Sequence, residues 1–198
     1  MNEIVSTHTL QAVVIGASAG AVDALMHLLP DLPADYPLAL LIVVHLPPDC
    51  ESTLASLLAS RSRITIKEAE DKEPIRPGTA YVAPPNYHLL VEPDFSLSLS
   101  SEEPVLFSRP SIDVLFESAA DAYGDSLAAV VLTGGNSDGA NGLKAVGAAG
   151  GVTLVQDPST ASSPDMPRAA LAACAAARSL DLGALAAVLR EELPRFDS

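Results

Sequence analysis

The stretch VVIGASAGAVDAL, residues 13–25, decides the fold class because it leads from an apolar strand through a glycine-rich turn into a helix. The helix predicted over 21–29 places Val22, Leu25 and Leu29 on one face. Such a strand–turn–helix unit is typical of a parallel α/β sheet. Its turn can either cradle a phosphate at the helix N-terminus or present Ser18 as a nucleophile.

The same alternation of apolar runs and amphipathic stretches continues along the chain and predicts an α/β fold. We expect a doubly wound, mostly parallel sheet flanked by helices, with a small antiparallel hairpin region near 79–100. The expected strands are 11–15, 38–44, 63–69, 127–133 and 151–157, with hairpin-like strands at 79–83, 88–92 and 96–100. The expected helices are 21–29, 52–60, 111–123, 138–150, 167–177 and 182–193. A single domain is predicted over 11–193, between an N-terminal arm (1–10) and a C-terminal tail (194–198).

Composition excludes several classes of protein. The 198 residues carry 25 acidic and 11 basic side chains, a formal net charge of −14, which argues against nucleic-acid binding. The longest apolar run, LALLIVV at 38–44, is far shorter than the ~18 residues of a membrane span, so no membrane insertion is expected. The N-terminus lacks the pattern of a secretory signal, and Cys50 and Cys174 have no metal-type spacing. A cytoplasmic location is therefore predicted.

Three polar residues follow three different predicted strands at the edge where α/β proteins bind ligands. Ser18 follows the first strand, His45 follows the strand at 38–44, and Asp138 follows the strand at 127–133. Each has an ordinary structural interpretation: a turn serine, a half-buried histidine, a helix-capping aspartate. Together they have the composition of a nucleophile, a base and a residue that orients the base.

The spacing of the glycines in the turn distinguishes between phosphate binding and the presentation of a nucleophile. The spacing of GASAGA (16–21) does not match the dinucleotide-binding pattern G-x-G-x-x-G, and the turn lacks the G-K-[ST] ending of a triphosphate loop. It does match the nucleophile-elbow pattern G-x-S-x-G through Gly16, Ser18 and Gly20. The order Ser18, His45, Asp138 differs from the order Ser, acid, His of α/β-hydrolases, so we expect shared chemistry in a different fold.

Six segments resemble, in the same order, the catalytic domain of the chemoreceptor methylesterases, the CheB-type protein-glutamate methylesterase family. They are IGASAG (15–20), VVHLPP (43–48), YVAPPNYHL (81–89), SRPSIDVLFESAA (108–120), LTGGNSDGANG (132–142) and VQDPSTASSPDMPRAA (155–170). The resemblance covers residues from about 11 to 192.

The resemblance implies that Ser18 is the nucleophile, His45 the general base and Asp138 the residue that orients His45. It implies hydrolysis of glutamate γ-methyl esters on the cytoplasmic helices of chemoreceptors with release of methanol, and in some members deamidation of receptor glutamines. Methylated chemoreceptors are thus the expected partners, with a separate receiver or chemosensory signalling protein as a second candidate. No metal and no organic cofactor is expected.

The chain departs from the family pattern at two turns. Ala19 and Ala21 stand where many members have threonine and glycine, and Gly135-Asn136 replaces Met-Gly. Gly135 can still supply a backbone N–H, and we expect Asn136 to tolerate a left-handed backbone there. The residues expected to line the oxyanion or substrate site are Ala19, Arg109, Gly135, Asn136 and Met166, with Arg168 and Lys144 as further sources of positive potential.

The first predicted strand begins about ten residues from the N-terminus, so we expect no receiver domain and no phospho-aspartate switch within these 198 residues. The altered turns leave one alternative open, a non-catalytic interaction module that keeps the esterase fold. A nucleotide-binding protein is a third hypothesis, disfavoured by the glycine spacing.

Overall fold

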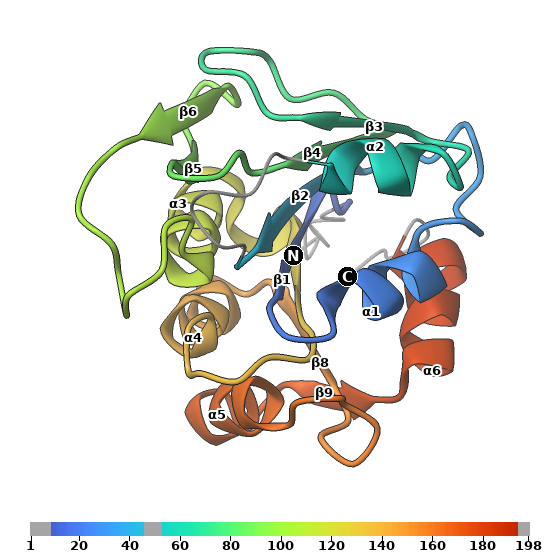
Figure 1. The fold of residues 1–198 in the computed structure, drawn as a ribbon, viewed down its shortest axis with the longest axis vertical. Coiled ribbons are helices and arrows are strands. Elements are labelled where there is room, and N and C mark those ends of the chain that lie inside the picture. The colour runs from blue at the N-terminus through green and yellow to red at the C-terminus, as the bar shows by residue number, and fades with distance from the viewer. Residues whose placement is uncertain (1–8, 46–52, 194–198) are drawn as a thin grey trace, which may run out of the picture.

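The centre of the molecule is a seven-stranded parallel sheet with the strand order β3-β4-β2-β1-β7-β8-β9 (Figure 1). The computed structural model describes residues 9–45 and 53–193. The strands of the main sheet are β1 (Ala12–Ala17), β2 (Ala39–Val44), β3 (Thr65–Glu68), β4 (Thr79–Val82), β7 (Leu127–Val131), β8 (Val152–Gln156) and β9 (Arg178–Leu180). A separate antiparallel pair consists of β5 (His88–Val91) and β6 (Leu97–Ser100).

Helices cover both faces of the sheet, which makes a three-layer, doubly wound fold. They are α1 (Ala21–Leu28), α2 (Leu54–Ala59), α3 (Ile112–Tyr123), α4 (Ala140–Ala148), α5 (Asp165–Ala173) and α6 (Leu182–Ala187). Short 3-10 and π segments, Gly124–Ser126 and Val188–Glu192, follow α3 and α6. None of the helices in the described part of the chain is long and apolar enough to cross a membrane.

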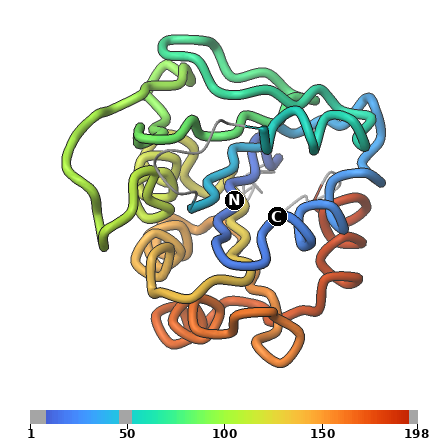
Figure 2. The backbone as a smooth tube through the Cα atoms, viewed as in Figure 1, coloured from blue at the N-terminus to red at the C-terminus, as the bar shows by residue number. Residues whose placement is uncertain are grey.

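The two faces have separate cores because successive strand residues point to opposite sides of the sheet. Val13 and Ile15 of β1 join α1, α2 and α6 in one cluster. Val14 of β1 joins α3, α4 and α5 in the other, and β5–β6 lies against α3 beyond them. The backbone trace in Figure 2 follows this winding, with the blue and red helices on one side and the yellow and orange helices on the other.

The predicted fold class is confirmed, and the structure revises some elements within it. The strand predicted at 79–83 as part of a hairpin region pairs in parallel with β2 and β3, so the antiparallel hairpin contains only β5 and β6. The helix predicted over 167–177 begins at Asp165, and Pro167 falls in its first turn, where a missing N–H leaves no bond unmade. Strand β9 was not predicted, because the three residues Arg-Ser-Leu are too few to show a periodicity. Of the predicted arm and tail, only Thr9 and Leu10 lie within the described residues.

Helices α3 and α4 pack closely because α4 carries Gly142 at the contact. A Cβ added to Gly142 would lie 2.5 Å from the Phe116 Cβ and 3.2 Å from the Asp113 carbonyl oxygen. We therefore expect Gly142→Ala to lower the free energy of unfolding by about 2 kcal/mol, since backbone and buried aromatic atoms must move apart. Urea denaturation measures this. Gly147→Ala on the same helix, which would meet the Cys174 Sγ at 3.1 Å, is the control and should lose less.

Candidate active site

Ser18 and His45 follow two strands that lie next to each other at the carboxyl edge of the sheet. The parallel register pairs Ala17 with Val44, so Ser18 and His45 are the next residues on each strand. The His45 N–H donates to the Ala17 carbonyl oxygen at 3.1 Å, and the Ser18 N–H donates to the Thr133 carbonyl oxygen at 2.9 Å. Ser18 is thereby held between the segments that leave β2 and β7.

The turn after β1 presents Ser18 at the start of α1. Gly20 ends the turn with φ 85°, and a Cβ there would lie 2.9 Å from the Ser162 Cβ. Only glycine adopts that backbone freely and also fits that space. The Ala21 N–H donates to the Ser18 carbonyl oxygen at 2.9 Å, which closes the turn and leaves Ser18 half-buried with Ala19 exposed.

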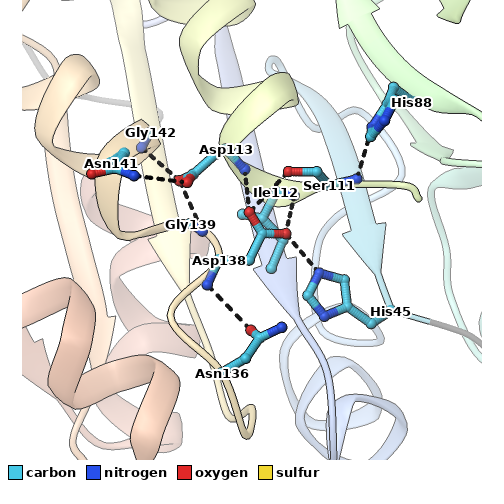
Figure 3. Close-up of polar contacts among 10 residues, drawn as sticks. All are labelled: His45, His88, Ser111, Ile112, Asp113, Asn136, Asp138, Gly139, Asn141 and Gly142. Carbon is cyan, nitrogen blue, oxygen red and sulfur yellow. Dashed lines mark hydrogen bonds and ion pairs between the residues drawn. The ribbon is translucent and has the colours of Figure 1, made fainter. Parts of the chain in front are cut away.

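His45 forms a hydrogen bond with Asp138, as Figure 3 shows. The distance from His45 Nε2 to Asp138 Oδ2 is 2.7 Å, and the side chains are 12% and 0% exposed. The second ring nitrogen, Nδ1, faces away from Asp138 (Figure 3). Because Nε2 is engaged with a carboxylate, the neutral ring carries its proton there and Nδ1 keeps a free lone pair.

Asp138 is held ionised by further donors from the start of α3. Its Oδ2 also accepts from the Ile112 N–H at 2.7 Å, and its Oδ1 accepts from the Ser111 hydroxyl at 2.9 Å and the Asp113 N–H at 3.0 Å. Burial alone would raise the pKa of Asp138, but the hydrogen bonds from His45, Asp113 and Ile112 outweigh it and hold that pKa below its ordinary value. The carboxylate is therefore a fixed negative partner for His45.

A second buried carboxylate, Asp113, mirrors this arrangement (Figure 3). It accepts from the N–H groups of Gly139 (2.9 Å) and Gly142 (2.8 Å) and from the Asn141 amide (3.2 Å) at the start of α4. Asp138, just before α4, thus caps α3, and Asp113, in the first turn of α3, caps α4. This exchange of caps fixes the loop that carries Asp138.

The two carboxylates differ in their titration. Burial raises the pKa of Asp113, despite its backbone donors, and the nearby charge of Asp138 adds to the rise. The folded protein therefore binds this proton more tightly than the unfolded chain does, and the wild type should gain stability relative to Asp113→Asn as the pH falls from 7 toward 4. Urea denaturation of both proteins at both pH values checks the sign. A stability difference that is independent of pH, or that changes in the opposite direction, would contradict the raised pKa.

Glycines let α3 approach Asp138. The side chain of Ile112, the first residue of α3, occupies the space where a Cβ on Gly16 would lie. A Cβ on Gly139 would be 2.8 Å from the same side chain, and Gly139 also has the positive φ of 94° in this loop. Gly16, assigned from the sequence to the nucleophile turn, thus also positions the donor from α3.

His88 is a buried residue that supports the site through a hydrogen bond with Ser111. It is 2% exposed, its Nδ1 accepts from the Ser111 N–H at 3.1 Å, and its Nε2 lies 3.1 Å from the Glu103 carbonyl oxygen. An N–H donor on one side and a carbonyl on the other fix a neutral ring with the proton on Nε2. His88 therefore positions Ser111, which in turn donates to Asp138.

Thr133 connects the turn that carries Ser18 to the loop after β7. Its hydroxyl donates to the Ala19 carbonyl oxygen at 2.8 Å and accepts from the Ser163 N–H at 2.9 Å. Its own N–H donates to the Gln156 side-chain oxygen at 2.9 Å. Sequence reasoning missed Thr133, Ser111 and Asp113 as supporting residues, although all three lie in the quoted motifs.

The residues predicted to line the site fall into distinct positions. Ala19 and Gly135 are exposed, and among the described residues neither backbone N–H donates a hydrogen bond. The left-handed backbone that Asn136 was expected to tolerate is not required of it, because its φ is not positive, and its Oδ1 accepts from the Asp138 N–H at 3.2 Å. Met166 is 1% exposed and lies where a Gly134 Cβ would be, so it packs against the buried side of the loop that contains Gly134.

Among the described residues, the predicted basic side chains form no hydrogen bond with Ser18, His45 or Asp138. Arg109 is half-buried, and its guanidinium donates to the carbonyl oxygens of Ser101 (2.8 Å) and Glu102 (3.0 Å). Arg168 and Lys144 are exposed on α5 and α4. Among the described residues no group of three His, Cys, Asp or Glu side chains is placed to hold a metal ion.

Comparison with known proteins gives one consistent family. The family model described as CheB methylesterase matches residues 13–189. A protein of Leptospira interrogans, provisionally named a protein-glutamate methylesterase/protein-glutamine glutaminase, is 50% identical over 163 residues, which are 82% of this chain and 84% of that protein. The enzyme of that name from Paraburkholderia xenovorans is 43% identical over 88% of this chain, which spans about half (48%) of its length.

A solved structure agrees with these matches. The crystal structure of the Thermotoga maritima CheB methylesterase catalytic domain superposes with a TM-score of 0.86 at 32% sequence identity, covering 94% of this chain and 98% of that one. Family model, relatives and fold therefore coincide over nearly the whole described chain. The chain belongs to the CheB methylesterase family.

Proposed function

We propose that this protein is a cytoplasmic serine esterase that hydrolyses glutamate γ-methyl esters on the cytoplasmic helices of chemoreceptors and releases methanol. The observation that carries the proposal is the 2.7 Å bond between His45 and the buried, ionised Asp138, one strand away from a serine in a nucleophile-elbow turn. The names of the relatives support the substrate class.

In the first step the Ser18 Oγ attacks the ester carbonyl carbon while His45 Nδ1 takes the hydroxyl proton. Asp138 keeps the other ring nitrogen protonated and stabilises the imidazolium that forms. The protonated ring then gives its proton to the departing methoxide oxygen. Methanol leaves, and the glutamyl group remains esterified to Ser18.

The negative oxygen of the tetrahedral intermediate needs donors that are not already in use. The backbone N–H groups of Ala19 and Gly135 meet this condition within the described residues and border the turns that carry Ser18 and Asp138. A backbone N–H does not depend on the side chain, so Ala19 and Gly135 can serve in place of threonine and methionine.

Water completes the cycle: its oxygen attacks the acyl carbon while His45 takes its proton, the bond to the Ser18 Oγ breaks, and His45 returns the proton to that oxygen. The product glutamate carries a negative charge that the ester lacked, and it forms next to a protein of net charge −14. Repulsion between like charges therefore favours release of the product. The same acyl chemistry applies to a glutamine side chain with ammonia as the leaving group, in keeping with the second activity in the relatives' names.

A serine-directed fluorophosphonate probe tests the catalytic assignment without a receptor. We expect one covalent adduct per chain, located on Ser18 by peptide mass spectrometry. A folded protein that is not labelled would instead support the non-catalytic interaction module. An adduct on another serine would exclude Ser18 as the nucleophile.

A further inference from the structure

The loop between β6 and α3 ends in a tight, apolar hairpin, residues 105–108 (the 105–108 hairpin). Val105 and Ser108 exchange two backbone hydrogen bonds, at 3.1 and 2.8 Å. Leu106 and Phe107 form the turn between them and are 45% and 103% exposed, so the phenyl ring packs against none of the described residues. Figure 1 shows this yellow-green loop projecting from the left of the molecule.

The residues of this turn are unusual for its geometry. Leu106 has φ 47° and Phe107 has φ 64°, so both central residues are left-handed, as in a type I′ turn. Asn-Gly is the favoured pair for that turn, whereas bulky side chains are strained in it. Phe107 gains nothing from burial against the described residues, and Leu106 keeps nearly half of its surface exposed. The stability of the fold therefore does not account for Leu106 and Phe107.

Hydrogen bonds fix the two segments of the loop on either side of the hairpin. The Arg109 guanidinium binds the carbonyl oxygens of Ser101 and Glu102, and His88 binds the carbonyl oxygen of Glu103. Both ends of the loop are thus tied down, and the hairpin between them is closed by its own two bonds. The apolar tip is presented in a defined position.

The tip also lies close to the proposed catalytic centre. Only three residues lie between Phe107 and Ser111, whose hydroxyl donates to Asp138, so the two Cα atoms are at most about 14 Å apart. Exposed apolar side chains also follow two strands at the same carboxyl edge: Val22 after β1 and Tyr87 after β4, 40% and 44% exposed. Exposed apolar side chains near a reacting centre fit a macromolecular substrate.

We propose that the 105–108 hairpin anchors the protein substrate, with Leu106 and Phe107 inserted between side chains of the receptor helices while an esterified glutamate is at Ser18. The proposal rests on the proposed function for the identity of the partner. Grooves between side-chain ridges of packed helices accept such apolar groups. Apolar contact supplies an attraction that does not depend on the protein's net charge of −14 and that salt does not screen.

The double variant Leu106→Asn/Phe107→Gly removes the anchor and leaves the turn with its preferred residues. Its melting temperature should equal or exceed that of the wild type, so misfolding cannot account for lost activity. On a fully methylated chemoreceptor in nanodiscs we expect KM for methanol release to rise about tenfold or more, since two apolar side chains no longer become buried. Turnover of p-nitrophenyl acetate, which needs no anchor, should stay within twofold.

Phe95→Asn is the matched control. Phe95 is also exposed (42%) and also has a positive φ (60°), but its ring lies against Tyr123, the last residue of α3, at the other end of that helix from Ser111. It should leave KM for the receptor unchanged.

Co-sedimentation with the same nanodiscs, in a Ser18→Ala background, separates this inference from the proposed function. Weaker binding of the double variant supports the anchor even if the wild type releases no methanol. An unchanged KM in the double variant, with an active wild type, would overturn the anchor and leave the esterase assignment intact. Loss of p-nitrophenyl acetate turnover in the double variant would show that the two side chains also affect catalysis, and would overturn a role confined to anchoring. If the wild type self-associates and the double variant does not, the 105–108 hairpin would instead be a contact between copies of the chain. Failure of the wild type both to bind and to hydrolyse would contradict both proposals.

Discussion

Replacing Ser18 with alanine is expected to lower the rate of ester hydrolysis by about a million-fold, to the level left by substrate binding and the oxyanion donors. Without the Oγ no acyl-enzyme can form, and His45 and Asp138 have no nucleophile to activate. Turnover of p-nitrophenyl acetate and labelling by a fluorophosphonate should both be lost. The fold should not suffer, because the backbone bonds of Ser18 to Thr133 and Ala21 do not involve the side chain.

Ser137→Ala is the control for this change. Ser137 is an exposed serine one residue before Asp138, in the loop that borders the same site. Its loss should leave turnover within a few-fold of the wild type. If Ser18→Ala retained activity near that of Ser137→Ala, the nucleophile would have to be another residue.

Asp138→Asn is expected to lower the rate of ester hydrolysis by about ten-thousand-fold. The four hydrogen bonds that described residues make to this side chain all come from donors, two to each oxygen. An amide has only one accepting oxygen, so its NH₂ group must face either the pair from His45 and Ile112 or the pair from Ser111 and Asp113. If it faces His45, the ring must accept there, and Nδ1 then carries the proton and cannot act as a base.

The same substitution should also destabilise the protein by about 1–3 kcal/mol, because a buried N–H is left without an acceptor. Asp113→Asn is the comparison for the loss of activity, since Asp113 is equally a buried helix cap but has no bond to His45. We expect it to retain more than a tenth of the wild-type turnover. Similar losses in both variants would mean that buried negative charge, rather than orientation of His45, is what matters.

The fold and the central residues could be predicted because they depend on local pattern. Strand β1, its glycine turn and α1 are contiguous in the sequence. The apolar pattern changes from that of a strand to that of a helix between Gly16 and Gly20, where the structure also passes from β1 to α1. Ser18, His45 and Asp138 each follow a buried strand directly or within one loop, and parallel strands bring their carboxyl ends to one edge. Their catalytic roles remain predictions, whereas the contact between His45 and Asp138 is present in the structure.

What the sequence did not reveal depends on pairing between distant segments. Strand β4 has the same alternating pattern whether it pairs in a hairpin or in the parallel sheet, and only its contacts with β2 distinguish the two. The exchange of caps between Asp113 and Asp138 joins residues more than twenty positions apart, and each aspartate alone looks like an ordinary helix cap. The exposure of Phe107 likewise depends on the left-handed backbone of a turn, and the residues of that turn are not the ones that predict such a backbone.

Methanol release from a fully methylated chemoreceptor, measured side by side for the wild type and Ser18→Ala, tests the central claim most directly. Our account predicts release by the wild type and none above background from the variant, with both proteins folded. Equal release by the two proteins would contradict Ser18 as the nucleophile. No release from a wild type that binds the receptor would contradict the esterase assignment itself.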